Sequence, residues 1–213
     1  MTYMILNPSW NIPESIVKEE IVPNVNRNPG YLAEQNMKVY RGWVKSADEV
    51  DPRMIDWDSI PPESFPYVFR QEPGPLNPLG RIKFMLPNKY NIYLHDTPVR
   101  GLFSENSRAF SHGCIRLHRP LDLAEYLLSG DDEWDRDKIE AAIENNEETR
   151  VDILYPINVH IVYLTAWVDR EGVLQFRSDV YERDEKLARA LREETARLSG
   201  SAENDTYTVQ ISQ

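Results

Sequence analysis

The stretch that decides the fold is "GRIKFMLPNKYNIYLHD", residues 80–96. Two short runs rich in aliphatic and aromatic residues, "GRIKFMLP" and "NIYLHD", are joined through "PNKY", a pattern that predicts an antiparallel hairpin. Downstream, "FSHGCIRL" (residues 110–117) predicts a third strand and holds Cys114, the only cysteine in the chain. The span from Tyr93 to His118 contains three of the four histidines.

Alternation along these strands predicts a shared polar surface. Side chains of successive strand residues point to opposite faces, so Tyr93 and His95 lie together. In "SHGCIRLH" the same rule groups four further side chains, namely His112, Cys114, Arg116 and His118. If the two strands are neighbours and their apolar side chains face the core, both polar sets line one surface.

Regular structure is also predicted on either side of this region. "MILNPSWNIP" (residues 4–13) indicates a short strand ended by a turn, and Pro120 opens a predicted helix, followed by a second helix around Ile139. "NVHIVYLTAWVD" (158–169) and "VLQFRSDVY" (173–181) predict a strand pair around "REG", and residues 183–200 predict a final amphipathic helix before a polar tail. Strands with a few helical additions indicate a mainly β, α+β fold.

Residues 13–75 differ in composition from the rest of the chain. They hold nine of the fifteen prolines together with several large aromatic residues. "PESIVKEEIVPNV" and "NPGYLAEQN" predict short helices with prolines at their starts. The remainder shows no sustained period, so an irregular insertion is expected, either an active-site lid or a plain structural flap.

Composition bounds the possible partners of this 213-residue chain. The formal net charge of −11 argues against a nucleic acid bound through its phosphates. No apolar run has the length of a membrane span, and Met1 to Trp10 lacks the pattern of a signal peptide. Around the thiol the balance is locally basic, which suits a small anionic ligand such as a peptide carboxylate. The arginines concerned are Arg100, Arg108, Arg116 and Arg119.

A cysteine, a histidine and a glycine in this arrangement favour acyl-transfer chemistry. A thiol is nucleophilic as the thiolate, and an imidazole nearby can take its proton. Gly113 lets the main chain approach an oxyanion closely. The alternatives are an inert buried cysteine, a structural histidine and a zinc site. The zinc site, from His95, His112, Cys114 and His118, is disfavoured because ligands at alternate strand positions lack the tight spacing of structural zinc, so no metal or cofactor is expected.

His95, fifteen residues and then "SHGC" closely resembles the signature of the L,D-transpeptidase (YkuD-type) catalytic domain. "GRIKFMLPNKYNIYLHDTP", "FSHGCIRL" and "NVHIVYLTAWVD" are similar to the subgroup typified by YcbB, whose catalytic domain carries an inserted capping subdomain. The resemblance implies a β-sandwich catalytic domain over residues 1–185, with the capping insertion at 13–75 and a C-terminal helix and tail at 186–213. Strands that precede "ILNPSWNIP" in the family have almost no counterpart here, which predicts an unpaired sheet edge.

The resemblance also implies roles for individual residues. Cys114 is the acylated nucleophile and His95 is its base. At Asp96 the family uses a main-chain carbonyl to hold the imidazole, and the carboxylate of Asp96 is a second possibility. His112 and Gly113 match the oxyanion region. Tyr93 and Ser111 are expected to bind substrate, and Arg116 is expected either to bind a substrate carboxylate or to clamp a loop. Trp43 is a further candidate for substrate contact because of its place in the expected lid.

The function that follows from the resemblance is the cross-linking of peptidoglycan. A tetrapeptide stem would donate its acyl group to the thiol, and an amine of a neighbouring stem would accept it, which joins two third residues. An L,D-carboxypeptidase or other hydrolase with the same thiol, or an inactive muropeptide-binding relic, are the alternatives. The resemblance further implies a periplasmic or cell-envelope location and inhibition by carbapenems.

Overall fold

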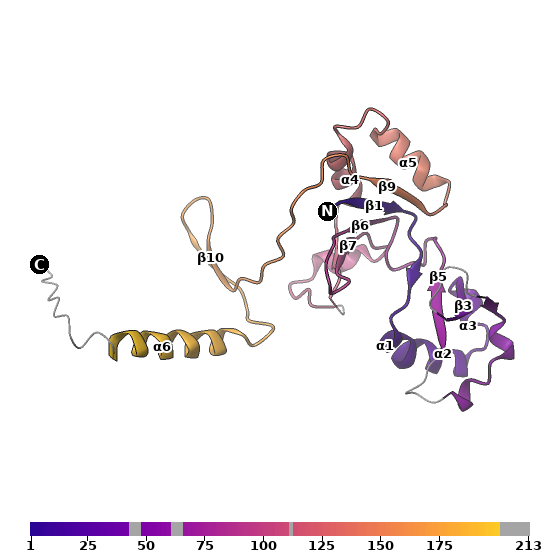
Figure 1. Ribbon diagram of the computed structural model, residues 1–213, viewed down its shortest axis with the longest axis horizontal. Helices are drawn as coiled ribbons and strands as arrows, with labels where there is room; N and C mark the ends of the chain where they lie inside the picture. Colours follow the sequence, from indigo (N-terminus) through magenta and orange to yellow (C-terminus); the bar gives the residue numbers. More distant parts are fainter. Residues whose placement is uncertain (43–47, 61–65, 111–112, 201–213) are drawn as a thin grey trace, which may run out of the picture. The chain divides into compact units, whose positions relative to one another are not determined.

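The computed structural model describes residues 1–42, 48–60, 66–110 and 113–200. The chain forms two compact units, Met1–Val159 and His160–Gln213 (Figure 1). The domain boundary after residue 185 that the resemblance implies stays a prediction. The fold is mixed α+β and mainly β in its first unit, as expected.

A five-stranded sheet in the order β8-β7-β6-β1-β9 is the centre of the first unit (Figure 1). The hairpin predicted over residues 80–96 is confirmed, because β6 and β7 pair antiparallel with Lys83 opposite His95. β8 runs parallel to β7. β1 is paired on both sides, with β6 and β9, so the outer strands of this sheet are β8 and β9. The strands are β1 (Tyr3–Leu6), β6 (Ile82–Met85), β7 (Tyr93–His95), β8 (Ile115–Arg116) and β9 (Thr149–Asp152).

Two predicted helices, α4 (Pro120–Leu128) and α5 (Arg136–Glu144), cover one face of this sheet. α4 has a proline in its first turn, where the missing N–H removes no helical hydrogen bond. The core between sheet and helices consists of Met4, Leu6, Ile82, Phe84, Leu94, Ala124, Leu127, Leu128, Ile139 and Val151. The opposite face of the same strands is therefore left to the alternate, largely polar side chains.

The inserted segment has a sheet and a hydrophobic core of its own. Its four strands lie in the order β2-β5-β3-β4 and are all antiparallel. They are β2 (Trp10–Asn11), β3 (Met37–Arg41), β4 (Glu49–Val50) and β5 (Tyr67–Gln71). The helical pieces are α1 (Glu14–Ile16), the π-helical η1 (Val17–Ile21), α2 (Val22–Arg27), α3 (Tyr31–Glu34) and the 3-10 helices η2 (Pro52–Met54) and η3 (Trp57–Ser59).

The short helices of this insertion were expected, but its strands were not. β3 and β5 are only five residues long, and prolines precede β5, so no pattern extends far enough to stand out. Their pairing buries Val39 and Phe69 completely, in a core shared with Val17, Ile21 and Leu32. The stretch expected to be irregular is therefore an ordered subdomain.

The second unit holds the hairpin β10 (Ala166–Val168) and β11 (Leu174–Phe176) and the long helix α6 (Asp184–Gly200). The predicted strand pair is confirmed, although both strands are shorter than expected. Large apolar side chains of this unit are exposed, among them Val162, Val168, Leu174, Phe176 and Leu187. Among the helices of the described residues, none has the length and apolarity that crossing a membrane requires.

Candidate active site

Two neighbouring strands bring the candidate catalytic side chains to one face of the five-stranded sheet. Parallel pairing sets His95 of β7 opposite Arg116 of β8, which brings Tyr93 level with Cys114. Leu94, between the two β7 residues, is buried in the core against the helices. Tyr93, His95, Cys114 and Arg116 therefore share the opposite face, called the site face below.

His95 is held in one orientation by the backbone. Its side chain is buried, and its Nδ1 lies 2.5 Å from the carbonyl oxygen of Asp96. Because a carbonyl only accepts, Nδ1 carries the proton and Nε2 is left as the basic nitrogen. Burial lowers the pKa of His95, and the charges of Arg116 and Lys83 act in the same direction. A neutral imidazole of this kind can take a proton from a thiol.

The thiol of Cys114 is half-buried beside Tyr93. The Tyr93 hydroxyl donates a hydrogen bond to the sulfur and accepts one from the indole N–H of Trp10. Burial raises the pKa of Tyr93 and negative charge at Cys114 raises it further, so the hydroxyl keeps its proton. Trp10 belongs to β2, which precedes the inserted segment and pairs with its strand β5, so the sheet of the insertion helps to place a ring of the site face.

Backbone conformation explains the glycine before the thiol. Gly113 has a φ of +130°, a region that side chains disfavour. A Cβ at this position would meet no atom of the non-adjacent described residues within 4 Å, and the requirement that they show is conformational. The open main chain here is what an oxyanion site formed by backbone N–H groups would need.

The carboxylate of Asp96 serves a structural purpose. Its Oδ2 accepts the backbone N–H of Arg81 at 2.8 Å, and its Oδ1 forms an ion pair with Arg100 at 2.6 Å. Arg100 begins the 3-10 helix η4 (Arg100–Ser104) and also donates to the carbonyl of His118 at 2.8 Å. Of the two groups of Asp96 that the sequence left open, the carbonyl is the one that contacts the imidazole.

These contacts make Arg100 a clamp between the segments that follow β7 and β8. Sequence reasoning counted Arg100 only as part of a basic stretch. Arg100 lies four residues after Asp96, a spacing that predicts an ion pair within a helix. The sequence predicts no helix here, so the ion pair could not be inferred from this spacing.

Comparison with known proteins decides the family. The YkuD family model, which describes the L,D-transpeptidase catalytic domain, matches residues 1–153. The chain belongs to the YkuD family. A Haemophilus influenzae protein named as a candidate L,D-transpeptidase is 33% identical over 187 residues. The alignment covers 88% of this chain and 37% of that relative, so the chain spans little more than a third of the relative's length.

Arg116 of this YkuD domain has a hydrogen-bond donor that no described residue binds. Its Nε is buried and has no hydrogen-bond partner among the residues that the structure describes. The guanidinium lies close enough to His95 to lower the pKa of that imidazole. A guanidinium with a free donor on the site face suits a carboxylate, which it can bind through a charge-assisted hydrogen bond.

Three of the sequence-predicted site residues have no described position, and two other histidines have surroundings of their own. Trp43, Ser111 and His112 fall outside the described residues. His118 packs on Phe103 with 4.9 Å between ring centroids, and His160 is exposed in the second unit. Within residues 1–42, 48–60, 66–110 and 113–200, no group of three or more His, Cys, Asp or Glu side chains is arranged to hold a metal ion.

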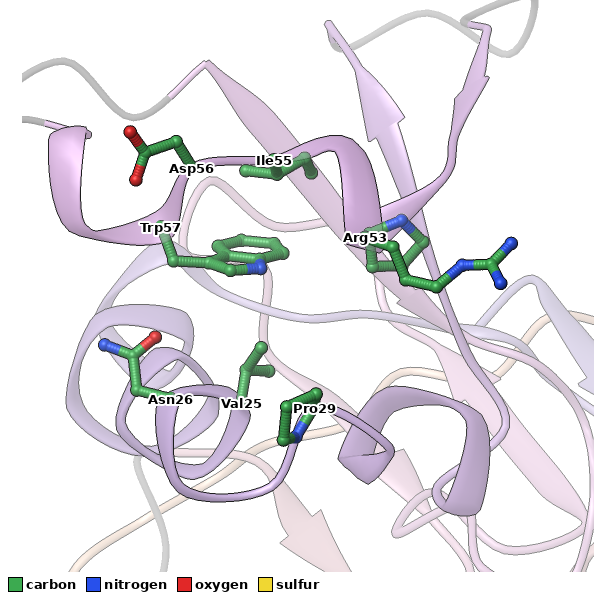
Figure 2. A pocket seen from close by; sticks show the side chains of 8 residues that line it. Val25, Asn26, Pro29, Arg53, Ile55, Asp56 and Trp57 are labelled. Atoms are coloured by element: carbon green, nitrogen blue, oxygen red, sulfur yellow. The ribbon is translucent and has the colours of Figure 1, made fainter.

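A hollow of about 410 Å³ lies in the inserted segment (Figure 2). Val25, Asn26 and Pro29 line it from α2 and the turn that follows, and Trp57 lies across it from η3. The indole of Trp57 also packs on Phe69, with 5.8 Å between the ring centroids. None of the lining residues belongs to the site face, so this hollow is separate from the thiol.

Proposed function

We propose that this YkuD domain is a peptidoglycan L,D-transpeptidase that forms a thioester on Cys114. The observation that carries the proposal is one half-buried thiol on the same sheet face as a neutral, backbone-oriented imidazole. Membership of the YkuD family supports the reaction class. The pairing supplies the two groups that thiol-dependent acyl transfer needs, a nucleophile and a base.

In the first half of the reaction, Nε2 of His95 takes the thiol proton and the sulfur of Cys114 attacks the carbonyl carbon of the third stem residue. The carbonyl oxygen becomes an oxyanion, which backbone N–H groups at Gly113 and Cys114 stabilise. One such donor contributes roughly 3 kcal/mol to the transition state. The C–N bond then breaks, and the departing D-alanine nitrogen takes the proton from the imidazolium.

In the second half, an amine of a neighbouring stem attacks the thioester carbonyl carbon. The imidazole of His95 takes a proton from the attacking nitrogen, and the sulfur of Cys114 leaves and is reprotonated. The product is an amide that joins two third residues. Water in place of the amine would give a tripeptide, so the two acceptors are distinguished by their products.

Substrate contacts are proposed for the cationic and aromatic groups of the site face. The unused donor of Arg116 supports a role in binding a stem carboxylate. Tyr93 would line the donor site, and Ser111, His112 and Trp43 keep the roles that the resemblance implies for them. A peptidoglycan substrate also implies a cell-envelope location, and a carbapenem would acylate the same sulfur.

Incubation of the purified protein with tetrapeptide muropeptides, followed by mass spectrometry, tests the reaction. We expect dimers from the wild type, no acyl-enzyme from Cys114→Ala, and acylation slowed about a hundred- to ten-thousandfold in His95→Gln. Because the pKa of His95 is lowered, the acid limb of the rate should have its midpoint below about 6.5, the ordinary histidine value.

The products also decide between the alternatives. Tripeptide monomers without dimers would replace the transpeptidase by a hydrolase. Unchanged tetrapeptide with tight binding would identify an inactive relic, and wild-type acylation rates in both variants would remove Cys114 and His95 from the mechanism.

A further inference from the structure

Lys83 is a half-buried lysine on the site face that the reaction described above does not use. It lies in the centre of β6, directly opposite His95 of β7. Its Nζ is 3.9 Å from the centroid of the Tyr93 ring. That ring carries the hydroxyl that donates to Cys114, so the ammonium, the phenol and the thiol form one contiguous group.

Among the described residues, no carboxylate forms an ion pair with the ammonium of Lys83. In the described ranges of the chain, no acidic oxygen lies within ion-pair distance of its Nζ. Negative charge reaches it from two groups, Cys114 and Glu148, and the effect of Cys114 is the larger. The carboxylate of Glu148 is already bound by the backbone N–H of Ser9 at 2.7 Å and by the Ser9 hydroxyl.

The imidazole does not supply this positive charge in the resting site. The pKa of His95 is lowered, chiefly by burial, so the ring is neutral near pH 7. His95 therefore becomes a positively charged partner for the sulfur only after it has taken the thiol proton of Cys114. Burial also lowers the pKa of Lys83, while negative charge at Cys114 opposes that change, so each charge favours the other.

We propose that Lys83 is a positioning residue that stabilises the thiolate form of Cys114. The proposal rests on the proposed function in one respect, that Cys114 is the nucleophile. His95 accepts and returns the proton, and Lys83 provides the fixed positive charge through the ring and hydroxyl of Tyr93. Among the described residues, the charged and titratable groups on the site face around Lys83 are Tyr93 and His95 on β7 and Cys114 and Arg116 at β8. Glu148, before β9, also acts on it.

Alkylation of the single cysteine by iodoacetamide, measured from pH 5 to pH 10, tests the proposal without any substrate. In Lys83→Met we expect the rate at pH 7 to fall about tenfold and the midpoint of the pH profile to move to higher pH, because the thiolate loses its cation. Lys83→Arg keeps the charge and should stay within about threefold of the wild type.

Lys89→Met is the matched control. Lys89 lies in the turn of the same hairpin, with its Nζ 5.0 Å from the centroid of Tyr90, but both residues are exposed and away from the site face. This variant should leave the profile unchanged. Circular dichroism and thermal unfolding verify the fold of each variant, and Lys83→Gln serves as a second uncharged variant if Lys83→Met is unfolded.

An unchanged midpoint in a folded uncharged variant would overturn the proposal. Equal losses in Lys83→Met and Lys83→Arg at an unchanged midpoint would also overturn it, because that result indicates packing rather than charge. Alkylation requires no stem peptide, so failure of the transpeptidase reaction leaves this result readable. Conversely, a shifted midpoint in a protein without muropeptide activity would support the role of Lys83 and contradict the proposed substrate.

Discussion

At the scale of single residues, two glycines near the site are required for different reasons. Gly113 has open space around it but a backbone φ of +130°. Gly80 has a φ of +62°, and a Cβ there would overlap the carboxylate of Asp96. Gly113 therefore determines the path of the chain at the thiol, whereas Gly80 makes room for the residue that orients His95.

Substitution of each glycine by alanine separates these two requirements. Gly113→Ala should retain the fold, with a stability loss of roughly 1–2 kcal/mol, and slow the acylation of Cys114 by about tenfold or more. Gly80→Ala should lower the free energy of unfolding further, by about 2–4 kcal/mol, because Asp96 must move. Urea unfolding and acylation by a carbapenem measure the two quantities. Equal stability losses in the two variants, or an unchanged acylation rate in Gly113→Ala, would contradict this assignment.

Alternation explains why part of the site could be predicted from the sequence. A period of two groups Tyr93 with His95, and Cys114 with Arg116, before any coordinates are known. Lys83 and Trp10 escaped notice because their place depends on which strands are neighbours, and strand order is not written in local patterns. The orientation of His95 by a carbonyl likewise depends on the chain's path after β7.

At the scale of elements, β7 and β8 form the least extensive pairing of the sheet. β8 has only two residues, and its parallel ladder with β7 is correspondingly short. The Asp96–Arg100 ion pair and the Arg100 bond to the His118 carbonyl reinforce it from outside. The relative position of His95 and Cys114 thus relies on this clamp as well as on the ladder.

Loss of the clamp should affect both stability and chemistry. Arg100→Gln leaves the buried Asp96 carboxylate without its cation, and we expect unfolding to become easier by about 1–3 kcal/mol. Acylation of Cys114 should slow, because the register between β7 and β8 places His95 relative to the thiol. Arg108→Gln is the control, because Arg108 is exposed and its Nε donates to the carbonyl of Glu105 rather than to Asp96. Indistinguishable urea midpoints for the two variants would show that the clamp contributes nothing.

Some helices and strands can be predicted from the sequence, and others cannot. The hairpin over residues 80–96 and the helices after Pro120 have long apolar patterns and clear start signals, so both were anticipated. The sheet of the insertion was not, because β3 and β5 become strands only by pairing with each other over Val39 and Phe69. Tertiary pairing outweighs weak local preference there.

At the scale of the whole molecule, the first unit contains two hydrophobic cores. Phe84 is fully buried in the core under the catalytic sheet, and Phe69 is fully buried in the core of the insertion. Trp10 and Tyr93 connect the two parts through a hydrogen bond. Both cores belong to one compact unit, which suggests shared rather than separate unfolding.

Matched substitutions test this cooperativity. Phe84→Ala and Phe69→Ala should each lower the free energy of unfolding by about 3–5 kcal/mol. If the first unit unfolds as one, either change will accelerate amide hydrogen exchange in both β1 and β3. Exchange that increases only in the sheet of the substituted phenylalanine would mean that the two cores unfold independently.

The central position of β1 has a consequence for how the protein is made. Tyr3 to Leu6 leave the ribosome before their partners in β6 and β9, which begin only at residues 82 and 149. Such long sequence separations slow folding, because the chain loses conformational entropy when distant segments meet, before their contacts stabilise the fold. During synthesis, the backbone groups of β1 therefore stay without their strand partners until β9 has been made, and a chaperone that shields nascent chains would protect them in that interval.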